Sequence, residues 1–117
     1  MSPYIAPGLD KISIDMILEH VSKVYGYPVK TILKPSRRRI FTEPRQIAVY
    51  LTRKRIKIKE KPISRNKIGA KFGMDNATVI YSENTIVNLI GSDIKVKGRY
   101  DRIVNMLPPD NINYASR

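Results

Sequence analysis

The side chains with the clearest chemical potential in this sequence are cationic. Lys and Arg number 22 against 10 Asp and Glu, which leaves a net charge of +12 on 117 residues. Residues 30–71 hold 15 of these cations and two of the acids, so this segment carries +13 and the rest of the chain −1. A charge concentrated in one segment indicates a single surface for a polyanion, which is nucleic acid, an anionic membrane surface or an acidic protein.

Other kinds of chemistry lack their residues. There is no cysteine, which excludes disulfides, thiolate nucleophiles and cysteine-based zinc sites, and His20 is the one histidine. The acids are scattered and no nucleophile has an evident partner, so we expect no enzyme, no cofactor and no metal site. The sequence contains neither a membrane-spanning run nor the start of a signal peptide, and no basic stretch has an opposite face of bulky apolar anchors, so we expect a cytosolic protein without a membrane partner.

The cations need a scaffold, and the apolar periodicity predicts a helical one. The length suits one domain, and a hydrophobic fraction of 42% is enough for a core. We expect an all-α fold of about five helices and no convincing sheet. The expected domain covers residues 12–107, between an N-terminal arm at 1–11 and a tail at 108–117. Helical patterns lie over residues 14–25, 28–33, 44–57, 65–72, 76–90 and 96–107.

Residue types at the ends of these patterns predict where helices begin and end. Ser13 is expected to cap the first helix and Gly26 to end it. Pro44 is expected to open the helix that follows the arginine run, because proline suits a first helical turn. Gly91 is expected to end the long helix after residue 75.

Two segments between the helices are rich in cations. Residues 34–39 (KPSRRR) are expected to form an exposed basic loop, because proline blocks a helix and three consecutive arginines resist burial. Residues 54–64 alternate charged and apolar side chains. That alternation fits a short strand, and it fits equally well a mobile extension held at three isoleucines.

A helix-turn-helix is predicted over about residues 64–90. The motif needs a small residue where the second helix crosses the first, and a residue that tolerates the left-handed conformation at the turn. Gly69 and Gly73 meet these needs, four residues apart. Apolar residues on both sides form the wedge: Ile68, Phe72, Met74 and Val79. Ser82 is the weak point, because a larger apolar residue is usual there. A plain helical hairpin would give no reason for the neighbouring positive charge.

The first turn of the second helix would then meet base edges in the major groove. Asn76 is the best base reader, because an amide can contact adenine through two hydrogen bonds. Thr78 can reach a phosphate or a thymine methyl group, and Ala77 can make apolar contact only. Asp75 is expected to be the N-cap of the helix. Tyr81 could reach a phosphate or pack in the core.

Taken in order, these elements resemble the C-terminal DNA-binding domain of the bacterial chromosomal replication initiator DnaA. The resemblance covers roughly residues 12–107 and implies a Trp-repressor-like, all-helical fold. Four motifs carry it: Arg37-x-Arg39, Pro44-Arg45-Gln46-Ile47-Ala48-x-Tyr50-Leu51, Ile68-Gly69-x-x-Phe72-Gly73 and Asp75-x-x-Thr78-Val79.

The resemblance implies how the domain would hold DNA. The loop arginines would enter the minor groove, and these are Arg37, Arg38 and Arg39. The following helix would contact the phosphate backbone through Arg45, Gln46, Arg53 and Lys54. The family's Asp-His-Thr-Thr signature is occupied here by Asp75, Asn76, Ala77 and Thr78.

Three features depart from the family pattern. Asn76-Ala77 replaces the His-Thr pair, which removes side chains that read the DnaA box. The turn after Gly73 is one residue short, and the connection over residues 54–65 is longer and more basic. The sequence has no G-x-x-x-x-G-K-[ST] phosphate loop, so no ATP binding is expected.

These observations predict a sequence-preferring protein that binds double-stranded DNA and takes part in the initiation of DNA replication or its control. The alternative is a phage or mobile-element helix-turn-helix protein, as a small-terminase-like subunit or a transcriptional repressor. RNA binding is the third hypothesis, but aromatic side chains are few and none interleave with the basic loop as stacking platforms would. Because no heptad segment is present, we expect a monomer, with association on DNA left open.

Overall fold

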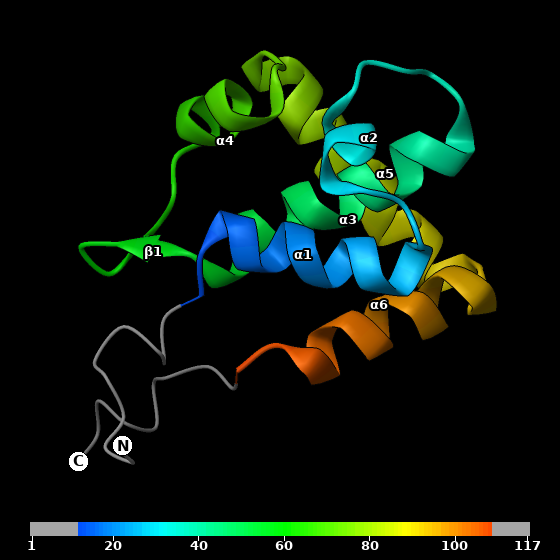
Figure 1. Cartoon of the computed structure of the whole chain (residues 1–117). Coiled ribbons are helices and arrows are strands. Elements are labelled where there is room, and N and C mark those ends of the chain that lie inside the picture. Colours follow the sequence, from blue (N-terminus) through cyan, green and yellow to red (C-terminus); the bar gives the residue numbers. More distant parts are fainter. Residues whose placement is uncertain (1–11, 109–117) are drawn as a thin grey trace.

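The computed structural model describes residues 12–108, so the arm expected at 1–11 and the tail from residue 109 onward lie outside the described residues. The described chain forms six helices and one two-stranded hairpin (Figure 1). In order they are α1 (Ile14–Tyr25), α2 (Val29–Leu33), α3 (Arg39–Arg55), β1 (Lys57–Ile58), β2 (Lys61–Pro62), α4 (Arg65–Phe72), α5 (Asn76–Ser92) and α6 (Ile94–Met106). The all-α class is confirmed. The expected count of about five is one short, because each of the six helical patterns forms a helix. The periodicity did not settle the small hairpin.

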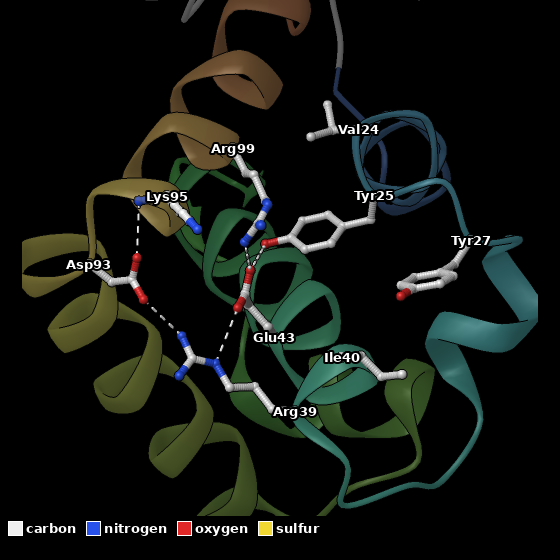
Figure 2. A pocket seen from close by; sticks show the side chains of 9 residues that line it. All are labelled: Val24, Tyr25, Tyr27, Arg39, Ile40, Glu43, Asp93, Lys95 and Arg99. Atoms are coloured by element: carbon white, nitrogen blue, oxygen red, sulfur yellow. Dashed lines mark hydrogen bonds and ion pairs between the residues drawn. The ribbon is translucent and has the colours of Figure 1, made fainter.

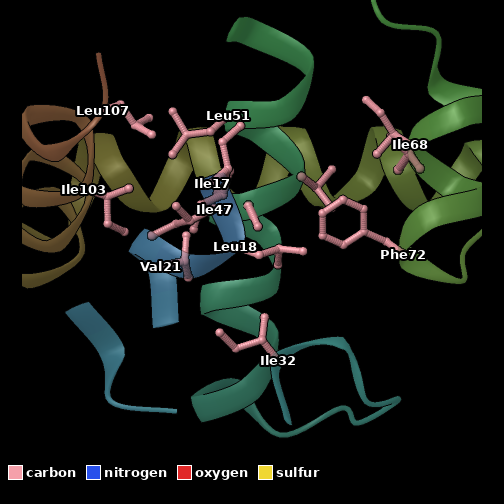
Figure 3. Packing of buried hydrophobic residues seen from close by; sticks show 14 of the residues in the cluster. Ile17, Leu18, Val21, Ile32, Ile47, Leu51, Ile68, Phe72, Ile103 and Leu107 are labelled. Atoms are coloured by element: carbon pink, nitrogen blue, oxygen red, sulfur yellow. The ribbon is translucent and has the colours of Figure 1, made fainter. Parts of the chain in front are cut away.

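The helix α3 is the centre of the fold. It packs against α1, α2, α4 and α5, while α6 packs against α1 and α5. Figure 3 shows the apolar side chains that these helices bury together. Members of this core that are almost inaccessible to solvent include Ile17, Leu18, Val21, Ile32, Ile47, Leu51, Ile68 and Ile103. The periodic apolar positions therefore point inward, and the burial of such side chains is the main source of stability in a domain of this size.

The ends of α1 are where the residue types predict them. The hydroxyl of Ser13 accepts a hydrogen bond from the backbone N–H of Met16 at 3.0 Å. Gly26 ends the helix with a φ of +79°, a left-handed conformation that costs glycine little. These two local signals mark the ends of α1, and packing against α3 and α6 holds the helix between them.

Several predicted helix ends are wrong: the helix expected to reach residue 57 ends at Arg55, and the one expected from residue 96 begins at Ile94. The helix α3 begins at Arg39, so Pro44 lies inside it and does not open it. Proline this early in a helix removes one backbone hydrogen bond, the one to the Ile40 carbonyl, and the burial of eight α3 residues outweighs that loss. The helix α5 continues through Gly91 to Ser92, because a helical glycine costs only about 1 kcal/mol. Asp93 ends α5 and caps α6.

The segment after α3 is a strand pair and not an extension. Lys57 faces Pro62 and Ile58 faces Lys61 in an antiparallel register. The N–H of Ile63 donates to the carbonyl of Ile56 at 3.0 Å, which closes the base of the hairpin. The side chain of Ile63 is buried in the core, which anchors the chain where it leaves the hairpin.

Candidate nucleic-acid interface

The helices α4 and α5 form the predicted helix-turn-helix, and local hydrogen bonds set its limits. Ser64 caps α4, where its hydroxyl accepts from the N–H of Lys67 at 3.2 Å. Gly73 ends α4 at a φ of +70°. Asp75 caps α5, and its Oδ1 accepts from the N–H of Thr78 at 2.8 Å. Hydrogen bonds from the side chain and backbone of Thr78 hold the pKa of Asp75 below its usual range.

A close approach of two backbones fixes the angle between α4 and α5. A Cβ atom on Gly69 would lie 2.2 Å from the carbonyl oxygen of Met74 and 3.7 Å from Cγ2 of Val79. The N–H of Met74 donates back to the Gly69 carbonyl at 2.9 Å. No residue larger than glycine fits here without a backbone shift, which is the requirement that a helix-turn-helix places on this position.

Polar contacts complete the packing of the motif. Ser82 is buried, with its hydroxyl 4.0 Å from the sulfur of Met74, so a small side chain fills the position expected to be large and apolar. Arg65, the first residue of α4, forms two hydrogen bonds with the carboxylate of Glu83 in α5, at 2.8 and 3.2 Å. This paired contact joins the start of α4 to the middle of α5.

The first turn of α5 is presented to solvent. Asn76, Ala77 and Thr78 are all exposed, next to the N-cap Asp75. Tyr81, one turn further on, is 64% exposed, so the core alternative for this side chain is wrong. All five residues predicted at the start of the second helix are therefore exposed, and one of them, Asp75, is the N-cap.

The outer face of α5 carries no cation, which the sequence analysis did not note. No Lys or Arg occurs between Asn76 and Ser92, and the single acid, Glu83, is paired with Arg65. Two apolar side chains on this helix are exposed, Ile80 at 42% and Val87 at 45%. They fall one position after the buried Val79 and Ile86, and this offset from the inward stripe is the sequence signal that could have found them.

The basic loop, residues 34–38, is held from behind by Arg45. Its Nε donates to the carbonyl of Ile32 at 2.8 Å, its Nη1 donates to that of Ser36 at 3.2 Å, and its Nη2 donates to that of Lys34. Burial lowers the pKa of the Arg45 guanidinium. The group still donates all three hydrogen bonds, because arginine stays protonated in proteins. The neighbouring Gln46 is buried, with 9% of its surface exposed. Arg45 therefore faces α2 and the loop, and Gln46 faces the interior of the domain.

The three consecutive arginines have different surroundings. Arg37 and Arg38 are exposed in the loop, and the guanidinium of Arg38 lies 5.8 Å from the centre of the Phe41 ring. Arg39 is the first residue of α3, and it pairs with Glu43 at 3.4 Å and with Asp93 at 3.1 Å. Of the predicted minor-groove arginines, the structure leaves two in the loop and ties the third to carboxylates.

Glu43 is the buried centre of a charge cluster that the sequence analysis missed, and its arginine partners are partly exposed (Figure 2). It is 5% exposed and accepts hydrogen bonds from Tyr25 Oη, from Arg99 Nη1 at 2.9 Å and from Arg39 Nε at 3.4 Å. Burial, reinforced by the hydrogen bond to Glu43, raises the pKa of Tyr25. The cluster lines an open cavity of about 480 Å³ between α1, α3 and α6. Partners 56 residues apart in sequence leave no local signal.

The last two predicted contacts lie near the end of α3. Arg53 Nη1 donates to the carbonyl of Ile63 at 2.7 Å, which fastens the hairpin to α3. Lys54 is exposed, with Nζ 5.6 Å from the centre of the Tyr50 ring. Within residues 12–108, no helix is long and apolar enough to cross a membrane.

Comparison with known proteins assigns the family. The model of the bacterial dnaA protein helix-turn-helix matches residues 14–86. The chromosomal replication initiator protein DnaA of Enterococcus faecalis is 35% identical over 99 residues, which are 84% of this chain and 21% of that protein. The protein of the same name from Streptococcus equi subsp. zooepidemicus is 33% identical over 102 residues, 86% of this chain and 22% of that protein. The chain therefore spans about a fifth of the length of these curated relatives, and it belongs to the bacterial dnaA protein helix-turn-helix family.

Proposed function

We propose that this chain binds double-stranded DNA with a sequence preference, and that it acts in the initiation of DNA replication or in its control. Two features support the proposal: the relatives are named chromosomal replication initiator proteins, and the segment around the motif is strongly basic. One observation carries it. The backbone contact between Gly69 and Met74 fixes α5 so that its first turn is exposed beside this basic segment.

The first turn of α5 would lie in the major groove and read base edges. Asn76 can donate to and accept from adenine through its amide, and the methyl group of Thr78 can contact that of thymine. The hydroxyl of Tyr81 could donate to a phosphate oxygen at the groove edge, because the Tyr81 side chain is exposed. Neither Ala77 nor the capping Asp75 adds a hydrogen-bond donor, so few base positions would be read strongly.

The basic loop would reach the adjacent minor groove. Arg37 and Arg38 are the side chains available for this contact, and a narrow, electronegative groove favours arginine. Arg45 would act indirectly, because it fixes the carbonyl groups of the loop and so the direction of the two arginines. Arg39 would hold α3 against α6 through Asp93.

Fluorescence anisotropy on three duplexes, each at two salt concentrations, tests the proposal. The duplexes are a DnaA box, a scramble of it and a pool of random sequence. Tighter binding to the box that survives higher salt supports initiator-like reading. Equal, salt-sensitive binding to all three supports DNA binding with a changed target, which selection from the random pool would then identify. No binding at low salt contradicts the proposal.

A substitution separates the recognition of bases from sequence-independent binding to the DNA backbone. Asn76→Ala is expected to cost about 1–3 kcal/mol on the preferred duplex and little on random sequence, because only the base contact is lost. Asn88→Ala is the matched control, since it removes the same exposed side chain three turns further along α5. Equal losses on preferred and random duplexes would rule out Asn76 as a reader.

A further inference from the structure

The hairpin at residues 57–62 has no part in the contacts proposed so far. All six of its side chains are exposed, and they include three lysines and one glutamate. Among the described residues, no carboxylate forms an ion pair with Lys57, Lys59 or Lys61. The hairpin thus presents three cations and one acid on six residues, a net charge of +2.

The base of this hairpin is firmly held. Ile63 is 5% exposed and packs in the core, its N–H bonds Ile56, and its carbonyl accepts from Arg53 of α3. The register places Lys57 and Lys61 on opposite faces, because facing residues of an antiparallel pair share a face. Lys59 and Glu60 form the tip, with φ values of 53° and 68°. A two-residue turn of type I′ requires positive φ at both of these positions. Cations therefore lie on both faces and at the tip of an anchored projection.

The position of the hairpin is set by α4. Ile63 and Ser64 alone separate β2 from α4, so Pro62 lies at most about 11 Å from Arg65. In a helix-turn-helix complex the first helix crosses the phosphate backbone, so a projection at its N-terminus lies beside that backbone. Figure 1 shows the hairpin leaving the body of the domain below α4, at the opposite end of α3 from the basic loop.

We propose that the hairpin at residues 57–62 is a second phosphate-binding element, which holds the DNA backbone at the side of α4. The inference rests on the proposed function. Lysine suits this task, because it is a compact charge that binds phosphate without reading sequence. The demand for such an element follows from α5, which has no cation of its own. The 17 residues of α3 span about 25 Å, so the loop and the hairpin lie at opposite ends of a long helix and would contact different parts of the backbone.

The first test compares two triple variants with the same loss of charge. Lys57→Gln/Lys59→Gln/Lys61→Gln removes the hairpin cations. The control, Lys23→Gln/Lys95→Gln/Arg102→Gln, removes three exposed cations of α1 and α6, to which the proposed function gives no DNA contact. Anisotropy on a random-sequence duplex over a salt series is expected to show that the slope of log K against log salt falls by about 2–3 for the hairpin variant. Its affinity should fall about 10- to 100-fold at moderate salt.

The control variant is expected to keep most of the slope, since it changes only the net charge. Equal changes in the two variants would overturn the inference and leave DNA binding intact. A wild-type chain that fails to bind any duplex would contradict the proposed function itself. The two failures are thus distinguishable in one experiment.

A second measurement does not depend on how the triple variant folds. Because the chain has no cysteine, Lys59→Cys offers a single attachment point for an iron chelate that cleaves nearby DNA. Cleavage of the bound duplex is expected from the tip of the hairpin and not from the matched Lys95→Cys variant in α6. Cleavage from neither position, or from both equally, would contradict the inference.

Discussion

The two ends of α3 use their cations in different ways. At the N-terminal end, Arg45 spends its donors on three backbone carbonyls, and Arg39 pairs with two carboxylates. At the C-terminal end, the lysines of the hairpin pair with no described carboxylate. Arginine, with five donors in a planar fork, is suited to bracing a structure, whereas lysine is suited to presenting a charge. A count of basic residues therefore does not show which cations are free to meet a partner, since Arg53 at the C-terminal end also donates to a backbone carbonyl.

The largest effect should come from neither end of α3 but from the close approach between α4 and the turn that follows it. Gly69→Ala places a methyl group against the backbone of Met74, which must move. We expect a loss of about 3 kcal/mol in the free energy of unfolding, measured by urea denaturation. Gly98→Ala in α6 is the control, because nothing lies within 4 Å of a Cβ there and a helical alanine is favourable. Similar stability of the two variants would contradict the close approach.

The next largest effect tests the two ends directly. Glu43→Gln removes the buried anion that Arg39 and Arg99 share, and we expect a loss of about 2 kcal/mol in stability. Glu60→Gln, the same change at the tip of the hairpin, should alter stability by less than about 0.5 kcal/mol. Thermal unfolding followed by circular dichroism measures both, and equal shifts in Tm would remove the contrast.

A smaller effect compares two arginines that donate to carbonyls. Arg45→Lys leaves most of three acceptors without a donor, so we expect a loss of about 1–2 kcal/mol. Arg53→Lys should cost less, about 0.5 kcal/mol, because one ammonium group can serve the single carbonyl of Ile63. Urea denaturation gives the two values. A larger loss at Arg53 would show that the hairpin end is the one that depends on arginine.

The smallest effect is a pH dependence confined to one end. The N–H groups of Val96 and Lys95, with Arg39 opposite, hold the pKa of Asp93 below its usual range. A carboxyl with a lowered pKa in the folded state stabilises the fold above its unfolded pKa, and this contribution disappears as the pH falls through the folded value. The protection factor of the amide hydrogens at the start of α6, which corrects for the pH dependence of intrinsic exchange, should therefore fall below about pH 4. Asp93→Asn should abolish this change while leaving exchange in the hairpin unaltered.

Local signals predicted much of the fold. The caps at Ser13, Ser64 and Asp75 and the left-handed glycines at 26 and 73 are visible in the sequence because each acts within four residues. The start of α3 was not predictable in the same way. Proline favours a first turn locally, but burial of the α3 face decides the outcome, and burial depends on helices distant in sequence.

The exposed residues of the candidate site were predictable from the sequence, and the arginines that bind other parts of the fold were not. The first turn of α5 follows from the position of the turn at Gly73. The orientation of Arg45 and Arg39 does not, because their partners include carbonyl groups of α2 and the loop and the carboxylate of Asp93 before α6. Whether an arginine on a helix meets solvent or a carbonyl is a property of the packed domain.

The neutral surface of α5 has a consequence for how such a domain would find its site. Electrostatic contact with phosphates is equally strong at every position of a duplex, so cations that flank the motif would keep the protein on DNA while it diffuses along it. A recognition helix without cations forms no further ionic contacts with phosphates that would slow that movement. Residence at a given site would then depend on a few short-range contacts from Asn76 and Thr78, so variation in the target would alter the dissociation rate and leave the association rate nearly constant.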